Sequence, residues 1–63
     1  MSDHAARPLI LVVEDEAAIA TMLRYNLEKQ GFRVEEATDG QEAMDRIAET
    51  TPDLVLLDWM LPV

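Results

Sequence analysis

The hydrophobic residues fall into short unbroken runs and longer periodic stretches. Leu9–Val13 and Leu54–Leu57 are continuous aliphatic runs of strand length. Because neither run alternates with polar residues, both are expected to be strands buried on both faces, as in a parallel sheet. The half-polar stretch over residues 32–37 predicts a third strand, with Val34 as its inward anchor and Glu35 or Glu36 facing water.

Two periodic stretches between these runs predict helices packed on a sheet. In the first, over residues 17–30, apolar residues recur about every fourth position, and Gly31 stands where a left-handed C-cap is expected. The expected apolar side consists of Ile19, Met22, Leu23 and Leu27, and the expected polar side carries Arg24, Glu28 and Lys29.

The second helix is expected to start at Asp39, with Glu42 completing a capping arrangement, and to end at residues 50–52. Glu42 and Arg46 are spaced for an ion pair. The expected apolar stripe consists of Ala43, Met44, Ile47 and Ala48.

The resulting order is strand, helix, strand, helix, strand, which is an α/β arrangement of two βαβ units with right-handed crossovers. The two aliphatic strands should be neighbours, and the half-polar strand should lie at an edge. That gives the spatial order 2-1-3 of an incomplete flavodoxin-like parallel sheet. Residues 9–63 form this unit, and the polar residues 1–8 are expected to be a disordered leader.

Composition narrows the function classes. With 63 residues, the chain is at most one small domain, and it has no cysteine for disulfides or thiolate metal sites. Its net charge of −8 argues against direct binding of nucleic acid or an anionic membrane. The N-terminus does not resemble a secretory signal, and no apolar run is long enough to span a bilayer, so a cytoplasmic location is expected.

Three carboxylates follow the two aliphatic strands. Glu14 and Asp15 come directly after the first, and Asp58 directly after Leu54–Leu57. Because parallel strands end at the same rim of a sheet, these acids should meet where the sheet reverses its winding. Such a cluster of oxygen ligands suits Mg²⁺, and the isolated Asp58 is the expected nucleophile for a phosphoryl group. Taken singly, Glu14 and Asp15 are explained at least as well by the favourable charge at a helix start, as we expect for Glu16, and Asp58 by a turn before Pro62. Taken together after two aliphatic strands, the acids favour the metal site.

Four segments together resemble two-component response-regulator receiver domains. They are residues 10–16, 31–34, 37–43 and 52–62, so the resemblance covers nearly the whole chain. The sequence Leu-Leu-Asp-Trp-Met-Leu-Pro at residues 56–62 is similar to the corresponding segment of phosphate-regulon transcriptional regulators of the winged-helix subfamily.

The resemblance implies a role for each matching residue. Asp58 would be the phosphoacceptor, Asp15 a direct Mg²⁺ ligand, Glu14 a second-sphere acid, and Met60 a ligand through its backbone carbonyl. Val63 departs from the glycine that many relatives carry, so the turn there is expected to differ. The hydroxyl residue and the lysine that hold the phosphoryl group in this family belong to further strands that have no counterpart in this sequence.

The resemblance also implies partners: a sensor histidine kinase as phosphodonor, and DNA only through an output domain outside this chain. Leu54–Leu57 would be an apolar sheet edge, so we expect a second copy or a remaining part of the receiver to cover it.

Other functions remain open from the residues alone. A magnesium-dependent phosphohydrolase with an aspartate nucleophile is opposed by Met60, which stands where such enzymes usually carry a second aspartate. A purely structural α/β fragment is the third alternative. The favoured expectation is a signalling module and not an enzyme.

Overall fold

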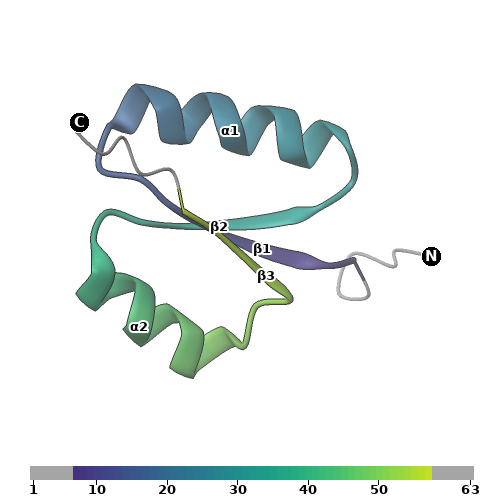
Figure 1. The fold of residues 1–63 in the computed structure, drawn as a ribbon. Helices are drawn as coiled ribbons and strands as arrows, with labels where there is room; N and C mark the ends of the chain where they lie inside the picture. Colours follow the sequence, from purple (N-terminus) through teal and green to yellow (C-terminus); the bar gives the residue numbers. More distant parts are fainter. Residues whose placement is uncertain (1–6, 58–63) are drawn as a thin grey trace.

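The computed structural model describes residues 7–57, and the expectations for residues 1–6 and 58–63 lie outside that part of the chain. Within it, the elements are β1 (Leu9–Val13), α1 (Ala17–Lys29), β2 (Arg33–Ala37), α2 (Gly40–Thr50) and β3 (Leu54–Leu57). The strands form a parallel sheet in the order β2-β1-β3, with α1 and α2 on opposite faces (Figure 1). The α/β class and the 2-1-3 order predicted from the sequence are therefore confirmed.

β1 is the buried centre of the sheet. All five of its residues are buried, and Leu11 and Val12 have no exposed surface. Alternate residues serve the two faces: Ile10 and Val12 pack with the apolar side of α1, while Leu11 and Val13 pack with α2. An unbroken aliphatic run is required here because both faces of the strand are covered.

Helix α1 ends as the sequence predicts. The backbone of Gly31 has φ of +98°, and its N–H donates to the Glu28 carbonyl at 2.9 Å. That left-handed conformation favours glycine, which lacks the Cβ that other residues would bring into contact with the backbone. The predicted apolar side needs one correction: Met22 is exposed, and the small Ala20 is the buried residue of this helix.

Helix α2 begins with the predicted cap. The Glu42 N–H donates to Asp39 Oδ1 at 2.8 Å, and Glu42 Oε1 accepts from the N–H and the hydroxyl of Thr38 at 2.7 and 3.0 Å. These bonds to Thr38 lower the pKa of Glu42 below its usual 4.5. The charge of Arg46 also lowers the pKa of Glu42, as expected for a favourable pair, but the close contact of Arg46 is with Glu49 at 3.9 Å, because Glu42 is turned back to Thr38.

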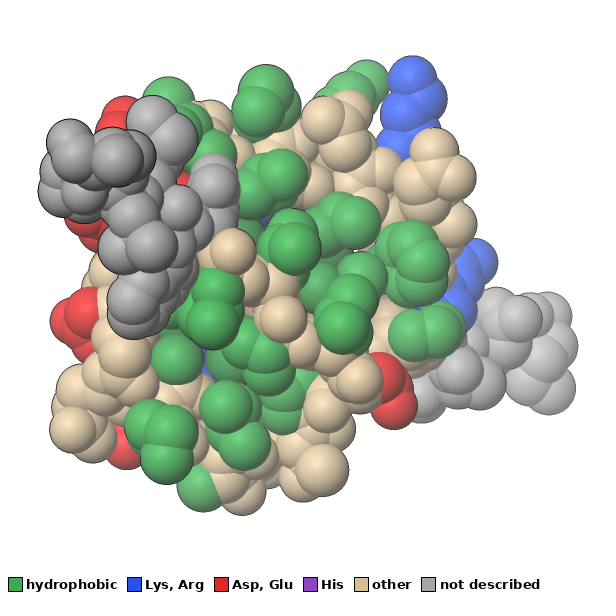
Figure 2. Space-filling model, viewed as in Figure 1, with side chains coloured by type: hydrophobic (Ala, Val, Ile, Leu, Met, Phe, Trp, Pro, Cys, Tyr) green, Lys and Arg blue, Asp and Glu red, His purple; other side chains and the backbone are tan. Residues whose placement is uncertain are grey.

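The predicted apolar stripe of α2 is largely wrong within residues 7–57, and β3 is not buried on both faces but forms the apolar sheet edge that the sequence also predicted. Of the expected stripe on α2, Ala43 is buried, whereas Met44 is 64% exposed. On β3, Leu54 and Leu57 are more than half exposed, because β1 pairs along one side of β3 and no described element lies along the other. Figure 2 shows hydrophobic side chains spread across this side of the molecule.

Candidate functional site

The candidate site lies at the carboxyl ends of β1 and β3, which run parallel and in register. Val13 pairs with Leu57, the last residue of each strand. The chain therefore leaves both strands at the same rim, through Glu14 on one side and toward Asp58 on the other. Asp58 and Met60 themselves lie outside the described residues, so the rim is described from its Glu14 and Asp15 side.

Glu14 is a buried carboxylate, with 6% of its surface exposed. Its N–H donates to the Ala37 carbonyl at 2.9 Å, which extends the pairing of β1 with β2 by one residue. Its Oε2 accepts the Glu16 N–H at 2.9 Å, so the side chain is turned toward the start of α1. Glu14 is thus held at the base of the rim by the backbone on both sides of it.

Asp15 differs from Glu14 because it is exposed. The adjacent Glu16 is the N-cap residue of α1, but its side chain makes no capping hydrogen bond. Glu16 therefore lies at the helix start, as expected, but contributes its charge there without a capping hydrogen bond. A buried acid next to an exposed one gives the rim one fixed carboxylate and one that can reach a cation in solvent.

Residues 7–57 contain no group of three or more metal-ligating side chains close enough to hold a metal ion. The structure places Glu14 and Asp15 at the end of β1. The predicted third carboxylate, that of Asp58, lies outside the described residues. The donor chemistry of the described pair still suits a hard cation, since both side chains offer carboxylate oxygens.

Asp53 fixes the opposite ends of the same two strands, and the sequence reasoning missed it. Its Oδ2 accepts the Leu9 N–H at 2.7 Å, and its own N–H donates to the Leu9 carbonyl at 2.8 Å. This reciprocal pair sets the register that brings Val13 beside Leu57 at the rim. The available signal was the position of Asp53, one residue before an aliphatic strand and after Pro52.

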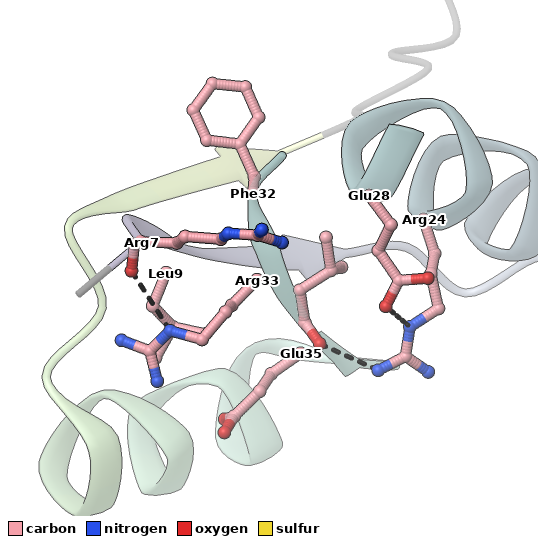
Figure 3. A pocket seen from close by; sticks show the side chains of 8 residues that line it. Arg7, Leu9, Arg24, Glu28, Phe32, Arg33 and Glu35 are labelled. Carbon is pink, nitrogen blue, oxygen red and sulfur yellow. Dashed lines mark hydrogen bonds and ion pairs between the residues drawn. The ribbon is translucent and has the colours of Figure 1, made fainter. Parts of the chain in front are cut away.

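A separate cavity of about 370 Å³ lies beside β2, away from the acidic rim. Figure 3 shows the side chains that line it, including those of Arg7, Arg24 and Arg33. Arg24 was assigned to the polar side of its helix, but it turns back onto β2 and hydrogen-bonds to the strand. The charge pattern alone does not reveal this contact, because it depends on how closely α1 approaches β2.

Neither helix of the described part has the length and apolar content needed to cross a bilayer.

Comparison with known proteins identifies a protein family. The model of the response regulator receiver domain family matches residues 10–63.

Three relatives are transcriptional regulatory proteins. The phosphate regulon protein PhoB of Rhizobium meliloti is 56% identical over 55 residues, which are 87% of this chain and 24% of that protein. The alkaline phosphatase synthesis protein PhoP of Bacillus subtilis is 53% identical over 53 residues, 84% of this chain and 22% of that protein. PhoB of Escherichia coli is 55% identical over 53 residues, again 84% of this chain and 23% of that protein.

The chain thus spans about a quarter of the length of these curated relatives. The family match covers both strands that end at the acidic rim, together with α1, β2 and α2. With the parallel 2-1-3 sheet and the acidic pair after β1, it leads to one assignment: the chain belongs to the receiver domain family of two-component response regulators.

Proposed function

We propose that this chain is the phosphoaccepting part of a response regulator, and that Asp58 receives the phosphoryl group from a sensor histidine kinase. The observation that carries the proposal is the pairing of Val13 with Leu57. Because these residues end adjacent parallel strands, Glu14 and Asp15 lie at the rim toward which Asp58 is expected to extend. In the transfer, an Asp58 carboxylate oxygen forms a bond to phosphorus while the phosphorus–nitrogen bond of a phosphohistidine breaks.

Mg²⁺ is the proposed cofactor of this rim. Exposed Asp15 suits a direct ligand, and buried Glu14, held by the Glu16 N–H, suits a second-sphere acid that orients metal-bound water. Asp58 and the backbone carbonyl of Met60 would complete the protein ligands, as the family resemblance implies. When bound, the cation would offset the negative charge of the clustered carboxylates and of the phosphoryl oxygens.

The proposed output is transcriptional regulation, as the printed names of the relatives suggest. Contact with DNA would then require a domain outside this chain, since the chain itself carries a net charge of −8. We place the protein in the cytoplasm, for which the lack of cysteine is supporting evidence. In a longer receiver, a further part of the domain would cover the outer edge of β3.

The experiment uses a chimera in which residues 9–63 replace the matching part of PhoB from Rhizobium meliloti, which supplies the rest of the regulator. The chimera is incubated with Mg²⁺ and phosphoramidate, and its intact mass is measured. We expect the mass to rise by one phosphoryl group, and we expect no rise for Asp58→Asn. A rise that persists in Asp58→Asn would refute the assignment of the acceptor.

A matched pair of variants tests the metal site. Asp15→Asn removes a proposed ligand charge, whereas Asp45→Asn removes the same charge from the exposed side of α2. Asp15→Asn should raise the Mg²⁺ concentration for half-maximal phosphorylation at least about tenfold, the effect of losing a ligand or its support. Asp45→Asn should leave that concentration unchanged, and equal effects of the two variants would refute the assignment.

A further inference from the structure

The cavity beside β2 gathers most of the positive charge of the chain. Arg7, Arg24 and Arg33 line it, and they are three of only five lysine and arginine residues in a chain with a net charge of −8. Its volume of about 370 Å³ falls within the range of roughly 300–1,000 Å³ that is usual for small-molecule sites. The cavity lies by the amino ends of β1 and β2, so a ligand there would not compete with the acidic rim.

One of the three cations, Arg24, is already neutralised. Its Nη1 lies 3.1 Å from Glu36 Oε2, and its Nε lies 3.4 Å from Glu28 Oε2. Its Nη2 donates to the Val34 carbonyl at 2.7 Å. Because its charge and its donors are engaged, Arg24 forms a wall of the cavity together with Glu28, and neither residue is the expected anchor for a ligand.

Arg33 is held in place but keeps two donor groups for a ligand. Its Nε donates to the Arg7 carbonyl at 3.0 Å, and its backbone N–H donates to the Pro8 carbonyl at 2.9 Å. Within residues 7–57, no hydrogen bond or ion pair engages its two Nη groups. The planar fork of a guanidinium group matches the two oxygens of a carboxylate. Arg33 therefore offers the cavity an oriented site for an anionic group.

Glu35 offers the opposite chemistry in the same cavity. Its Oε1 is buried and accepts no hydrogen bond from the described residues, which is costly for a carboxylate oxygen. Glu35 and Arg33 are two residues apart on β2, so their side chains leave the same face of the strand about 6.6 Å from each other. Both line the cavity (Figure 3). A donor on a ligand would supply the partner that Glu35 Oε1 lacks.

We propose that this cavity binds a free amino acid with an apolar side chain. The ligand carboxylate lies on the Nη fork of Arg33, and its ammonium group donates to Glu35 Oε1. Phe32 and Leu9 add hydrocarbon to the lining, against which the apolar side chain packs. A simple anion would leave Glu35 Oε1 without a donor, and a simple cation would face the charge of Arg33. A ligand that carries both charges satisfies both residues.

Titration of the purified chain with L-leucine, followed by amide NMR spectra, tests the proposal. We expect saturable shifts that are largest at the amides of Arg33 and Glu35. Two analogues each lack one charge: 4-methylpentanoate has no ammonium group, and 3-methylbutylamine has no carboxylate. Each should bind at least about tenfold more weakly than leucine, the effect of losing a hydrogen bond between charged groups. An absence of saturable shifts, or equal binding of leucine and either analogue, would overturn the proposal.

Three variants assign the two charges to their residues. Arg33→Met keeps the aliphatic stem but removes the fork, and it should weaken binding of leucine and of 4-methylpentanoate at least about tenfold. Glu35→Gln should weaken binding of leucine but not of 4-methylpentanoate, which a general loss of stability would weaken as well. Arg46→Met makes the same charge change as Arg33→Met on α2 and should leave binding unchanged. The proposal fails if Glu35→Gln weakens both ligands equally, or if Arg46→Met matches Arg33→Met.

Discussion

Replacing Asp53 should loosen the two strands that end at the acidic rim. In Asp53→Ala, the Leu9 N–H loses a charged acceptor at 2.7 Å. The loss is costly because Leu9 is only 5% exposed. The bond is part-buried, and a buried donor left without a partner costs about 1–3 kcal/mol, so we expect a loss of about 2 kcal/mol. Asp53→Asn retains an acceptor oxygen but not its charge, and should lose about 1 kcal/mol.

These losses are large relative to the total. A chain of 63 residues is expected to have an unfolding free energy of about 3–9 kcal/mol. Urea denaturation followed by circular dichroism should therefore show a clear decrease in midpoint, and the thermal midpoint should fall by about 10 °C for Asp53→Ala. Hydrogen exchange at the Leu9 amide should accelerate more than exchange elsewhere in β1.

Asp45→Ala is the control, because Asp45 is an exposed acid whose contact is a 3.3 Å bond from the Gln41 amide. It should change stability by less than about 0.5 kcal/mol. The reasoning is refuted if Asp53→Ala is no less stable than Asp45→Ala, or if protection of the Leu9 amide is unchanged.

Three other predictions concern single sites. Gly31→Ala should cost about 1 kcal/mol in urea denaturation because φ is +98°, although an added Cβ would meet no atom within 4 Å; no loss would show that the backbone relaxes. The stabilisation from Glu42 is present above pH 4.5 and is lost as the pH falls through its lowered pKa. Glu42→Gln should therefore reduce the decrease of the urea midpoint at acid pH. Equal decreases in the variant and the wild type would exclude the Thr38 bonds as the source of this pH dependence. Leu11→Ala, at a side chain with no exposed surface, should cost about 2–5 kcal/mol in urea denaturation, and an equal cost for Leu54→Ala, at a position 56% exposed, would contradict the assigned core.

The sequence predicted the parts of the fold that local pattern controls. Residues Leu9–Val13 could be recognised as a strand covered on both faces because no polar residue interrupts them. The left-handed end of α1 at Gly31 and the cap of α2 at Asp39 were also predicted, because each depends on residues within one helical turn.

The parts that depend on distant neighbours were predicted less well. An aliphatic composition made Leu54–Leu57 a candidate for burial on both faces. Because β3 is an edge strand of the described sheet, only its middle residues Val55 and Leu56 pack against the core. Arg24 was assigned to solvent because helix periodicity cannot show that a long side chain reaches a neighbouring strand. At the site, Glu14 and Asp15 lie where the strand order predicts, while the roles of Asp58 and Met60 stay predictions.

The reciprocal bonds between Leu9 and Asp53 join residues 44 positions apart in the sequence. During synthesis, β1 is made first, but its pairing with β3 must wait until almost all of the described chain has been translated. The entropy of closing this long loop is lost before the strand pairing compensates for it. The rim proposed to accept phosphate should therefore assemble late in folding, and until then one side of the all-aliphatic strand β1 would be available to chaperones.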